Sequence, residues 1–442
     1  MANPPRTQTA TKPGSTGIFS TRFKLAQAFS AESPNFYLLA GTTVLTVIFG
    51  LLMVLSASAV DSFLQNGGFF NAFTKQLGAA AIGIPAMLFM SRLPISAYRR
   101  YANGLLIFAA VLQLLVFTPL GYESGGNRNW LNLGFTTAQP SELIKVAIAI
   151  WLGVYLPPII ARNGRENWRV LVPLIPVFLV LGLVLAGGDL GTVIVLFMII
   201  LGCLVFSGVA KRVIAIPVML GGFGVFVMSI TSPNRMARIM SFLNANCIDY
   251  TNACWQPLHG KWALANGGFF GVGLGQSKAK WSWLPAADND YIFAIIGEEL
   301  GMIGALVVIG LFVVLTVAFL RIIRRAQDPL VRIATGGIMV WIVGEAFINI
   351  GVVLGVLPVL GVPLPLLSNG GTALITTLVG IGVVLSFTKD EPAIKPHRPR
   401  TRAPGGRPAP GRAAASGTAS GRTAPARPVP SRTIPRNSGA GR

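Results

Sequence analysis

The chain has 442 residues, of which 52% are hydrophobic and 12% are charged, and its formal net charge is +21. Soluble globular domains carry about twice this fraction of charged residues, and the mean hydropathy of this chain is +0.64. The composition therefore excludes an ordinary soluble protein and predicts an integral membrane protein.

Apolar stretches recur from residue 36 to residue 388, with short polar turns between most of them. A transmembrane helix needs about 20 apolar residues to cross a hydrocarbon core of about 30 Å. We therefore expect an all-α polytopic membrane protein with about ten transmembrane helices. In chain order the expected spans are 36–59, 75–91, 101–120, 140–157, 170–187, 190–208, 213–231, 290–320, 333–357 and 370–388.

The two ends of the chain differ in composition from this membrane domain. Residues 389–442 are basic, rich in Pro, Gly, Ala, Ser and Arg, and poor in large apolar side chains, which is typical of disordered segments. Residues 1–35 are interpreted in the same way, and they contain no cleavable signal peptide. We expect two disordered ends around a membrane domain at 36–388.

Lys and Arg are concentrated in alternate loops, for example at Arg92, Arg99 and Arg100 after the second span. Positive charge marks the cytoplasmic loops of membrane proteins, so both termini are expected in the cytoplasm. The outer segments 121–139 and 232–289 also hold Lys and Arg. This departure from the bias indicates either a functional role or contact with phospholipid headgroups.

Residues 232–289 form a large extracytoplasmic loop between the seventh and eighth expected spans. The loop is rich in Trp, whose ring suits the headgroup level of a membrane. Cys247 and Cys254 lie in this loop, where they either form a disulfide, worth about 2–3 kcal/mol, or remain two free thiols. A glycine run offers flexible backbone or phosphate contact, and its members are Gly267, Gly268, Gly271, Gly273 and Gly275.

Ionisable side chains at membrane depth are costly and by default suggest function. Glu142 and Lys145 are three residues apart and can pair on one helix face, as a structural ion pair or as part of a site. Residues 358–372 contain Pro and Gly and are interpreted as a re-entrant or kinked segment before the last span. The full set of candidates is Glu142, Lys145, Asp189, Asp290, Glu298, Glu299 and Glu345.

Asp290 stands where the large loop turns into the eighth span, and it is either a helix cap or a partly desolvated general base. Lys261 and Lys280 lie in the same loop and could hold an anionic group such as a phosphate. Small residues follow at helical spacing, which allows close helix approach or leaves a groove. They are Ala294, Gly297, Gly301 and Gly304.

These motifs, taken in order, resemble the SEDS family (shape, elongation, division and sporulation) of polytopic peptidoglycan polymerases. The resemblance covers residues 36–388. The matching motifs are Arg128-Asn-Trp130 with Gly134, Gln139-Pro-Ser-Glu142 with Lys145, Asp189-Leu-Gly-Thr192, Lys280 with Leu284-Pro285, Asp290-Tyr-Ile-Phe-Ala294, Glu298-Glu-Leu-Gly301, Asn349-Ile-Gly351, and Pro358 to Gly371 with Ser368.

The chain departs from the family pattern in three places. Asp288 is a second acid beside Asp290, the Cys247–Cys254 stretch is an insert, and Ser368-Asn-Gly-Gly-Thr372 replaces the usual Ser-Tyr-Gly-Gly-Ser. The basic, Pro-rich tail is more similar to the actinobacterial division members, of the FtsW type, than to the elongation members, of the RodA type.

The resemblance implies a peptidoglycan glycosyltransferase that polymerises lipid II into β-1,4 glycan strands at the outer face of the cytoplasmic membrane. Inversion at the sugar carbon requires a base, and the resemblance gives this role to Asp290. Arg128, Lys280 and Lys261 are expected near the leaving pyrophosphate. Further substrate-site residues are expected to be Glu142, Lys145, Asp189 and Ser368, some of which could hold a divalent cation, Mg²⁺ or Mn²⁺.

The resemblance also implies partners and a location. A class B penicillin-binding protein is the expected transpeptidase partner, and divisome proteins are expected to bind the cytoplasmic tail at the division septum. No nucleic-acid partner is expected. Two alternatives stay open: a lipid II flippase, which predicts key charges near the bilayer centre, and a division scaffold without catalysis.

Overall fold

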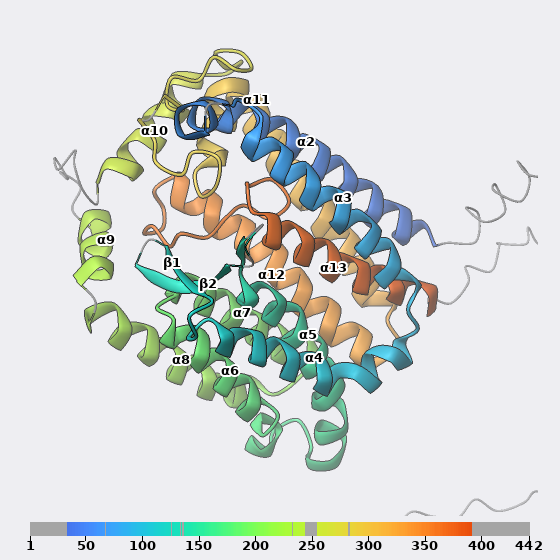
Figure 1. Cartoon of the computed structure of the whole chain (residues 1–442). Helices are drawn as coiled ribbons and strands as arrows, with labels where there is room; N and C mark the ends of the chain where they lie inside the picture. The colour runs from blue at the N-terminus through green and yellow to red at the C-terminus, as the bar shows by residue number, and fades with distance from the viewer. Residues whose placement is uncertain are drawn as a thin grey trace, which may run out of the picture. The chain divides into compact units, whose positions relative to one another are not determined.

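The structure is a computed structural model, and it describes residues 33–66, 68–124, 126–132, 134, 137–231, 233–243, 254–281 and 283–390. Each of the ten expected spans coincides with a helix (Figure 1), which confirms the polytopic α-helical fold. The ten helices are α2 (Pro34–Asn66), α3 (Asn71–Arg92), α4 (Ile95–Leu115), α5 (Pro140–Asn163), α6 (Leu174–Ala186), α7 (Leu190–Ser207), α8 (Lys211–Thr231), α11 (Ile292–Arg325), α12 (Pro329–Val353) and α13 (Gly371–Phe387).

Length and composition support a membrane location for this bundle. Seven of these helices are long and apolar enough to cross a membrane, and α6 and α13 are shorter apolar helices. Local signals set several boundaries. Pro140 opens α5 and Pro329 opens α12, as expected for a residue whose missing N–H is no loss at a helix start. The side chain of Asp328 accepts a capping hydrogen bond from the Leu330 N–H at 2.9 Å.

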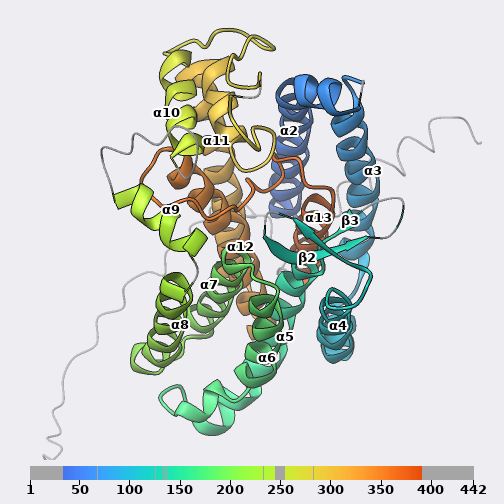
Figure 2. The ribbon, with the colours of Figure 1, turned by 60° about the vertical axis from the view of Figure 1, so that its left-hand side comes forward.

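Helix α12 lies inside the bundle and packs against α5, α7, α11 and α13. Gly337 of α12 faces Cys203 of α7, and Gly153 of α5 faces Ala334 of α12. Small residues at such contacts let helix backbones approach closely, which is how helices associate in a membrane. Cys203 is a buried free cysteine, as expected for a core residue. Figure 2 shows α12 among these helices.

A small antiparallel sheet occupies the segment between α4 and α5, where the sequence predicted no regular structure. Its strands are β1 (Gly121–Ser124), β2 (Asn127–Asn132) and β3 (Thr137–Ala138), paired in the order β1-β2-β3. The Arg128 N–H donates to the Gly187 carbonyl at 2.8 Å, so β2 rests on the turn between α6 and α7. Strands this short carry too few residues to display an apolar alternation.

The loop before α11 contains one further helix on each side of residues 244–253, which lie outside the described residues. These helices are α9 (Pro233–Leu243) and α10 (Trp255–Gly267). Helix α10 packs against α11. The short 3-10 helices η1 (Trp168–Leu171) and η2 (Thr388–Asp390) complete the described elements.

Helix α11 is interrupted at Gly301, whose φ of 67° lies in the left-handed region that favours glycine. The glycine run packs into this interruption. The Met302 N–H donates to the Gly268 carbonyl and the Val272 N–H to the Glu298 carbonyl, both at 2.9 Å. A side chain at Gly267 would collide with the Gly297 carbonyl. Gly267, Gly271 and Gly301 therefore serve close contact between backbones.

The segment between α12 and α13, here called the 354–370 loop, enters the bundle without regular helix. Its residues Leu364, Leu366 and Leu367 are at most 4% exposed. Non-helical backbone at this depth is tolerated only where protein or water satisfies its polar groups. The structure shows a break without regular helix before the last span, and re-entry into a membrane stays a prediction. The loop brings Ser368 next to the start of α11.

Candidate functional site

Asp290 immediately precedes α11, and its backbone is held by the 354–370 loop and α12. Asn349 Nδ2 donates to the Asp290 carbonyl at 2.7 Å and to the Val362 carbonyl at 2.8 Å. The N-cap residue of α11 is Tyr291, without a side-chain capping hydrogen bond. The Asp290 carboxylate is therefore not the helix cap that the sequence left open, and it is available for chemistry.

Ser368 ties the same two segments together. Its Oγ donates to the Asn289 carbonyl at 2.7 Å and accepts from the Leu364 N–H at 2.8 Å. The Ser368 carbonyl accepts from Gln76 Nε2 of α3 at 2.9 Å. Ser368 is 5% exposed. Its buried hydrogen bonds hold the backbone of Asn289, the residue before Asp290, against the 354–370 loop. Asp288, the second acid, accepts from Asn369 Nδ2 at 2.7 Å.

The surroundings raise the pKa of Asp290 to about 6. Burial of the carboxyl group is the main cause, and the negative charges of Asp189 and Asp288 add to it. The positive charge of Arg238 works in the opposite direction and lowers the pKa. A carboxylate with a pKa near 6 is ionised at neutral pH and is a stronger base than an ordinary aspartate.

Arg238 comes from α9, and its guanidinium and the Asp290 carboxylate both lie beside Gly361. A Cβ at Gly361 would lie 3.6 Å from Asp290 Oδ2 and 4.0 Å from an Arg238 guanidinium nitrogen. Arg235, one turn earlier, donates to the Gly188 carbonyl and, at 3.3 Å, to the Met228 carbonyl. These bonds anchor α9 over the α6–α7 turn. Sequence reasoning missed Arg238, although positive charge on the outer side was the available signal.

Asp189 caps α7 on the neighbouring side of the site. Its Oδ1 accepts from the Thr192 N–H at 2.9 Å, and its Oδ2 accepts from Thr192 Oγ1 at 2.6 Å. Gln139 Nε2, just before α5, donates to the same Oδ2 at 3.3 Å. Gly191, two residues after Asp189, lies against the Leu360 carbonyl. The Gln139-Pro-Ser-Glu142 and Asp189-Leu-Gly-Thr192 motifs thus meet beside the 354–370 loop.

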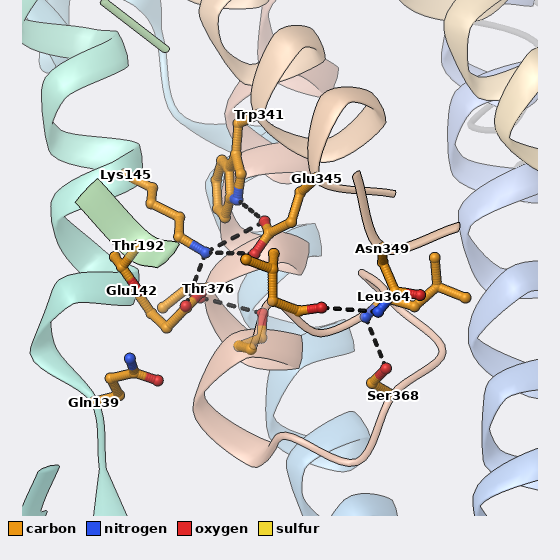
Figure 3. A network of polar contacts seen from close by, with 12 residues as sticks. Gln139, Glu142, Lys145, Thr192, Trp341, Glu345, Asn349, Leu364, Ser368 and Thr376 are labelled. Atoms are coloured by element: carbon orange, nitrogen blue, oxygen red, sulfur yellow. Dashed lines mark hydrogen bonds and ion pairs between the residues drawn. The ribbon is translucent and has the colours of Figure 1, made fainter. Parts of the chain in front are cut away.

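A second cluster lies deeper in the bundle, where Lys145 is held by two carboxylates (Figure 3). Its Nζ lies 2.8 Å from Glu142 Oε1 and 2.9 Å from Glu345 Oε1. Trp341 Nε1 donates to Glu345 Oε2 at 2.6 Å. The predicted Glu142–Lys145 pair is confirmed, and Glu345 joins it from α12. We call Glu142, Lys145 and Glu345 the buried triad.

Three predicted substrate cations do not gather at Asp290. Lys280 Nζ is buried, lies 3.2 Å from Glu299 Oε1 and donates to the Gly275 carbonyl at 2.6 Å. Lys261 is exposed on α10 and lies against Gly355, at the end of α12. Arg128 is exposed on β2, where it donates to the Thr118 carbonyl at 2.9 Å. Their roles toward a substrate stay predictions.

Glu298 and Glu299 hold the glycine-rich loop against α11. Glu298 Oε1 accepts from Asn266 Nδ2 at 2.9 Å and from the Lys278 N–H at 3.1 Å. Glu299 Oε2 accepts from Ser56 Oγ of α2 at 2.6 Å. These buried carboxylates are satisfied by loop and helix partners, which is the usual condition for a buried charge.

Two expectations on bonds and ions remain predictions. Cys247 lies outside the described residues, so its pairing with Cys254 stays a prediction. Among the described residues, no group of three or more His, Cys, Asp or Glu side chains is placed to hold a metal ion. The described acids near Asp290 therefore do not by themselves fit a divalent cation.

The sequence and the fold of this chain are similar to those of known proteins. A probable peptidoglycan glycosyltransferase FtsW of Mycobacterium tuberculosis is 38% identical over 360 residues, 81% of this chain and 68% of the relative. The stage V sporulation protein E of Bacillus subtilis is 36% identical over 362 residues, covering 81% and 97%. The crystal structure of the Thermus thermophilus rod shape determining protein RodA has a TM-score of 0.59 at 23% identity, covering 82% and 98%.

The solved RodA structure shows a similar fold, whereas the sequence relatives are similar enough to show the family. Residues 36–392 match the family of FtsW, RodA and SpoVE proteins, described as cell cycle protein. This range includes Asp290, Asp189, the buried triad and the 354–370 loop. The chain belongs to this SEDS family of polytopic membrane proteins.

Proposed function

We propose that this chain is a peptidoglycan glycosyltransferase that joins lipid II units into β-1,4 glycan strands. Relatives at 32–38% identity carry the names peptidoglycan glycosyltransferase FtsW and MrdB. The single observation that carries the mechanism is Asp290, a carboxylate with a pKa of about 6 that is held by its backbone beside a cation. This arrangement suits proton abstraction from a sugar hydroxyl.

The chemistry is a single displacement at the anomeric carbon of the donor sugar. Asp290 accepts the proton of the acceptor hydroxyl, whose oxygen attacks this carbon as the bond to the lipid pyrophosphate breaks. The electron pair of that bond leaves with the pyrophosphate. Configuration inverts from the α-linked donor to a β-linked product, and the strand grows by one disaccharide.

The leaving pyrophosphate needs positive charge aimed at it. We assign this role to Arg238, because its guanidinium lies beside Gly361, as the Asp290 carboxylate does, and the residue is exposed. A guanidinium can bind phosphate oxygens through two parallel hydrogen bonds. Lys280 suits this role less well in the arrangement described, because its charge is already matched by Glu299 in a buried pair.

Orientation, location and partner belong to the same proposal. The Asp290 end of the bundle lies at the outer face, both termini are cytoplasmic, and the protein acts at the division septum with divisome proteins on its tail. A class B penicillin-binding protein is the proposed partner. Support comes from a similar fold, at a TM-score of 0.60 and 22% identity, in a structure titled for polymerization and crosslinking by a peptidoglycan synthase complex.

The test is glycan-strand formation from purified lipid II by the full chain with its partner, comparing wild type with Asp290→Asn. The substitution keeps the size of the side chain and removes the base, so polymer should be lost while the complex still assembles. Full activity of Asp290→Asn would place the base elsewhere, and Asp288→Asn would then be compared.

The buried triad is the one observation that favours the alternative of a lipid II flippase, because it places ionisable groups deep in the bundle. Its charges are already paired with one another. A transport role requires lipid II to reach them. If vesicles containing Asp290→Asn protein moved lipid II between leaflets while wild type formed no polymer, the flippase would replace the enzyme.

A further inference from the structure

Four aromatic rings gather on one side of α10 and on the loop that precedes Asp290. The Trp255 and His259 rings stack with centroids 4.3 Å apart, and the Trp255 and Trp283 rings are nearly parallel, at 7° and 6.2 Å. Trp262 meets His259 edge-on at 4.9 Å. We call these four residues the aromatic platform.

The members of the platform differ in exposure. Trp283 is 55% exposed and Trp262 is 51% exposed, whereas His259 is buried. His259 Nδ1 lies 2.8 Å from the Trp255 carbonyl, which fixes the plane of the imidazole. The buried His259 ring stacks on Trp255, and Trp283 lies parallel to Trp255, so ring packing fixes the orientation of the exposed Trp283, as a preformed binding surface requires.

The platform is joined rigidly to the stretch that carries the base. Gln256 Nε2 donates to the Pro285 carbonyl at 3.0 Å. A Cβ at Gly260 would lie only 2.6 Å from the Tyr291 ring. Helix α10 therefore packs directly on residues 285–291, the stretch that leads to Asp290.

Flat aromatic faces have a chemistry of their own. The face of an aromatic ring is negative, and it attracts the weakly positive C–H groups of a neighbouring molecule. A β-1,4-linked pyranose strand is a flat ribbon whose axial C–H groups point to its two faces, so it can lie on such rings. These contacts have little direction along the strand, which lets a growing strand slide.

We propose that the aromatic platform is a subsite for the sugar rings of a β-1,4 glycan strand, which it holds as the strand leaves the Asp290 site. The inference rests on the proposed function for its choice of glycan. A membrane anchor and a contact for the transpeptidase partner are the competing roles. A nearby residue, Trp281, is 62% exposed and contributes no ring to the platform, so it provides a matched control.

The first experiment measures binding without catalysis. The probe is chitohexaose, a soluble β-1,4-linked oligosaccharide, titrated against the full chain carrying Asp290→Asn. We expect Trp283→Ala to weaken binding roughly two- to tenfold, the range expected for one aromatic contact. Trp283→Phe should restore most of it, and Trp281→Ala should leave it unchanged. Equal binding by all three variants would overturn the subsite.

The second experiment measures product length with lipid II and the partner present. Trp283→Ala should shorten the strands while the rate of the first coupling stays near that of wild type, because the base is untouched. A positive binding result with no polymer from wild type would reject the proposed function and keep the subsite. If Trp283→Ala instead weakened only partner binding, with chitohexaose binding unchanged, the platform would be a protein contact and the inference would be wrong.

Discussion

Asp290 and the buried triad are both made of ionisable residues in an apolar bundle, yet the fold surrounds them differently. Lys145 lies within 2.9 Å of a carboxylate on either side, and all three residues of the triad are at most 3% exposed. Asp290 is partly exposed, and three of its charged neighbours act on it, two acids and Arg238. The triad joins α5 to α12, whereas Asp290 keeps a reactive carboxylate.

This difference shows which of these carboxylates is suited to act as a base. A carboxylate inside a satisfied ion pair gives up its partner only at a large cost, so it is suited to holding helices together. A carboxylate that is desolvated but only partly matched by charge has a raised pKa and can take a proton at neutral pH.

The largest effect is expected from breaking the triad. Lys145→Met leaves two carboxylates facing each other in the bundle and should destabilise the protein by about 3–5 kcal/mol. Thermal unfolding in detergent measures the loss. Adding Glu142→Gln and Glu345→Gln to Lys145→Met should recover much of it, because no uncompensated charge is then left. A fully stable single variant would contradict the structural role of the triad.

A smaller effect is expected from loosening the support of Asp290. Ser368→Ala removes two hydrogen bonds, to the Asn289 carbonyl and from the Leu364 N–H, and should lower kcat by about 10- to 100-fold through misplacement of the base. KM for lipid II should change less. Ser207→Ala is the control, since its buried hydroxyl bonds only within α7. Equal kcat in both variants would show that Ser368 does not position Asp290.

The pH dependence of activity is expected to follow the ionisation of Asp290. Asp290 must be ionised to act as a base, so wild-type activity should fall as the pH drops through about 6. Arg238 lowers the pKa of Asp290, while Asp189 on α7 and Asp288 on the same loop raise it. Removing the cation in Arg238→Gln should therefore move the acid limb to higher pH and reduce kcat. Lys75→Gln, an exposed cation near Gln76, is the control.

The smallest effect is expected from Asp288→Asn, and its sign is opposite. Asp288 raises the pKa of Asp290, so removing its charge should move the acid limb to lower pH with little change in kcat at neutral pH. The two profiles, measured side by side with lipid II, form one test. If the acid limb moved in the same direction in both variants, the limb would not reflect the ionisation of Asp290.

Much of the fold could be predicted from the sequence. Apolar stretches located all ten helices, because a span is a local property of about 20 consecutive residues. The i, i+3 spacing of Glu142 and Lys145 predicted their ion pair, since both lie on one helix face. The position of Asp290 at the end of the large loop was visible in the same local way.

Other features were decided only by tertiary structure. Glu345 reaches Lys145 from 200 residues away, and Lys280 is drawn into a buried pair with Glu299 instead of toward Asp290. Arg238 meets Asp290 because Arg235 anchors α9 over the α6–α7 turn. No pattern of spacing along the chain encodes these meetings. They arise because separate helices and the 354–370 loop pack together and their charged groups must be matched inside an apolar bundle.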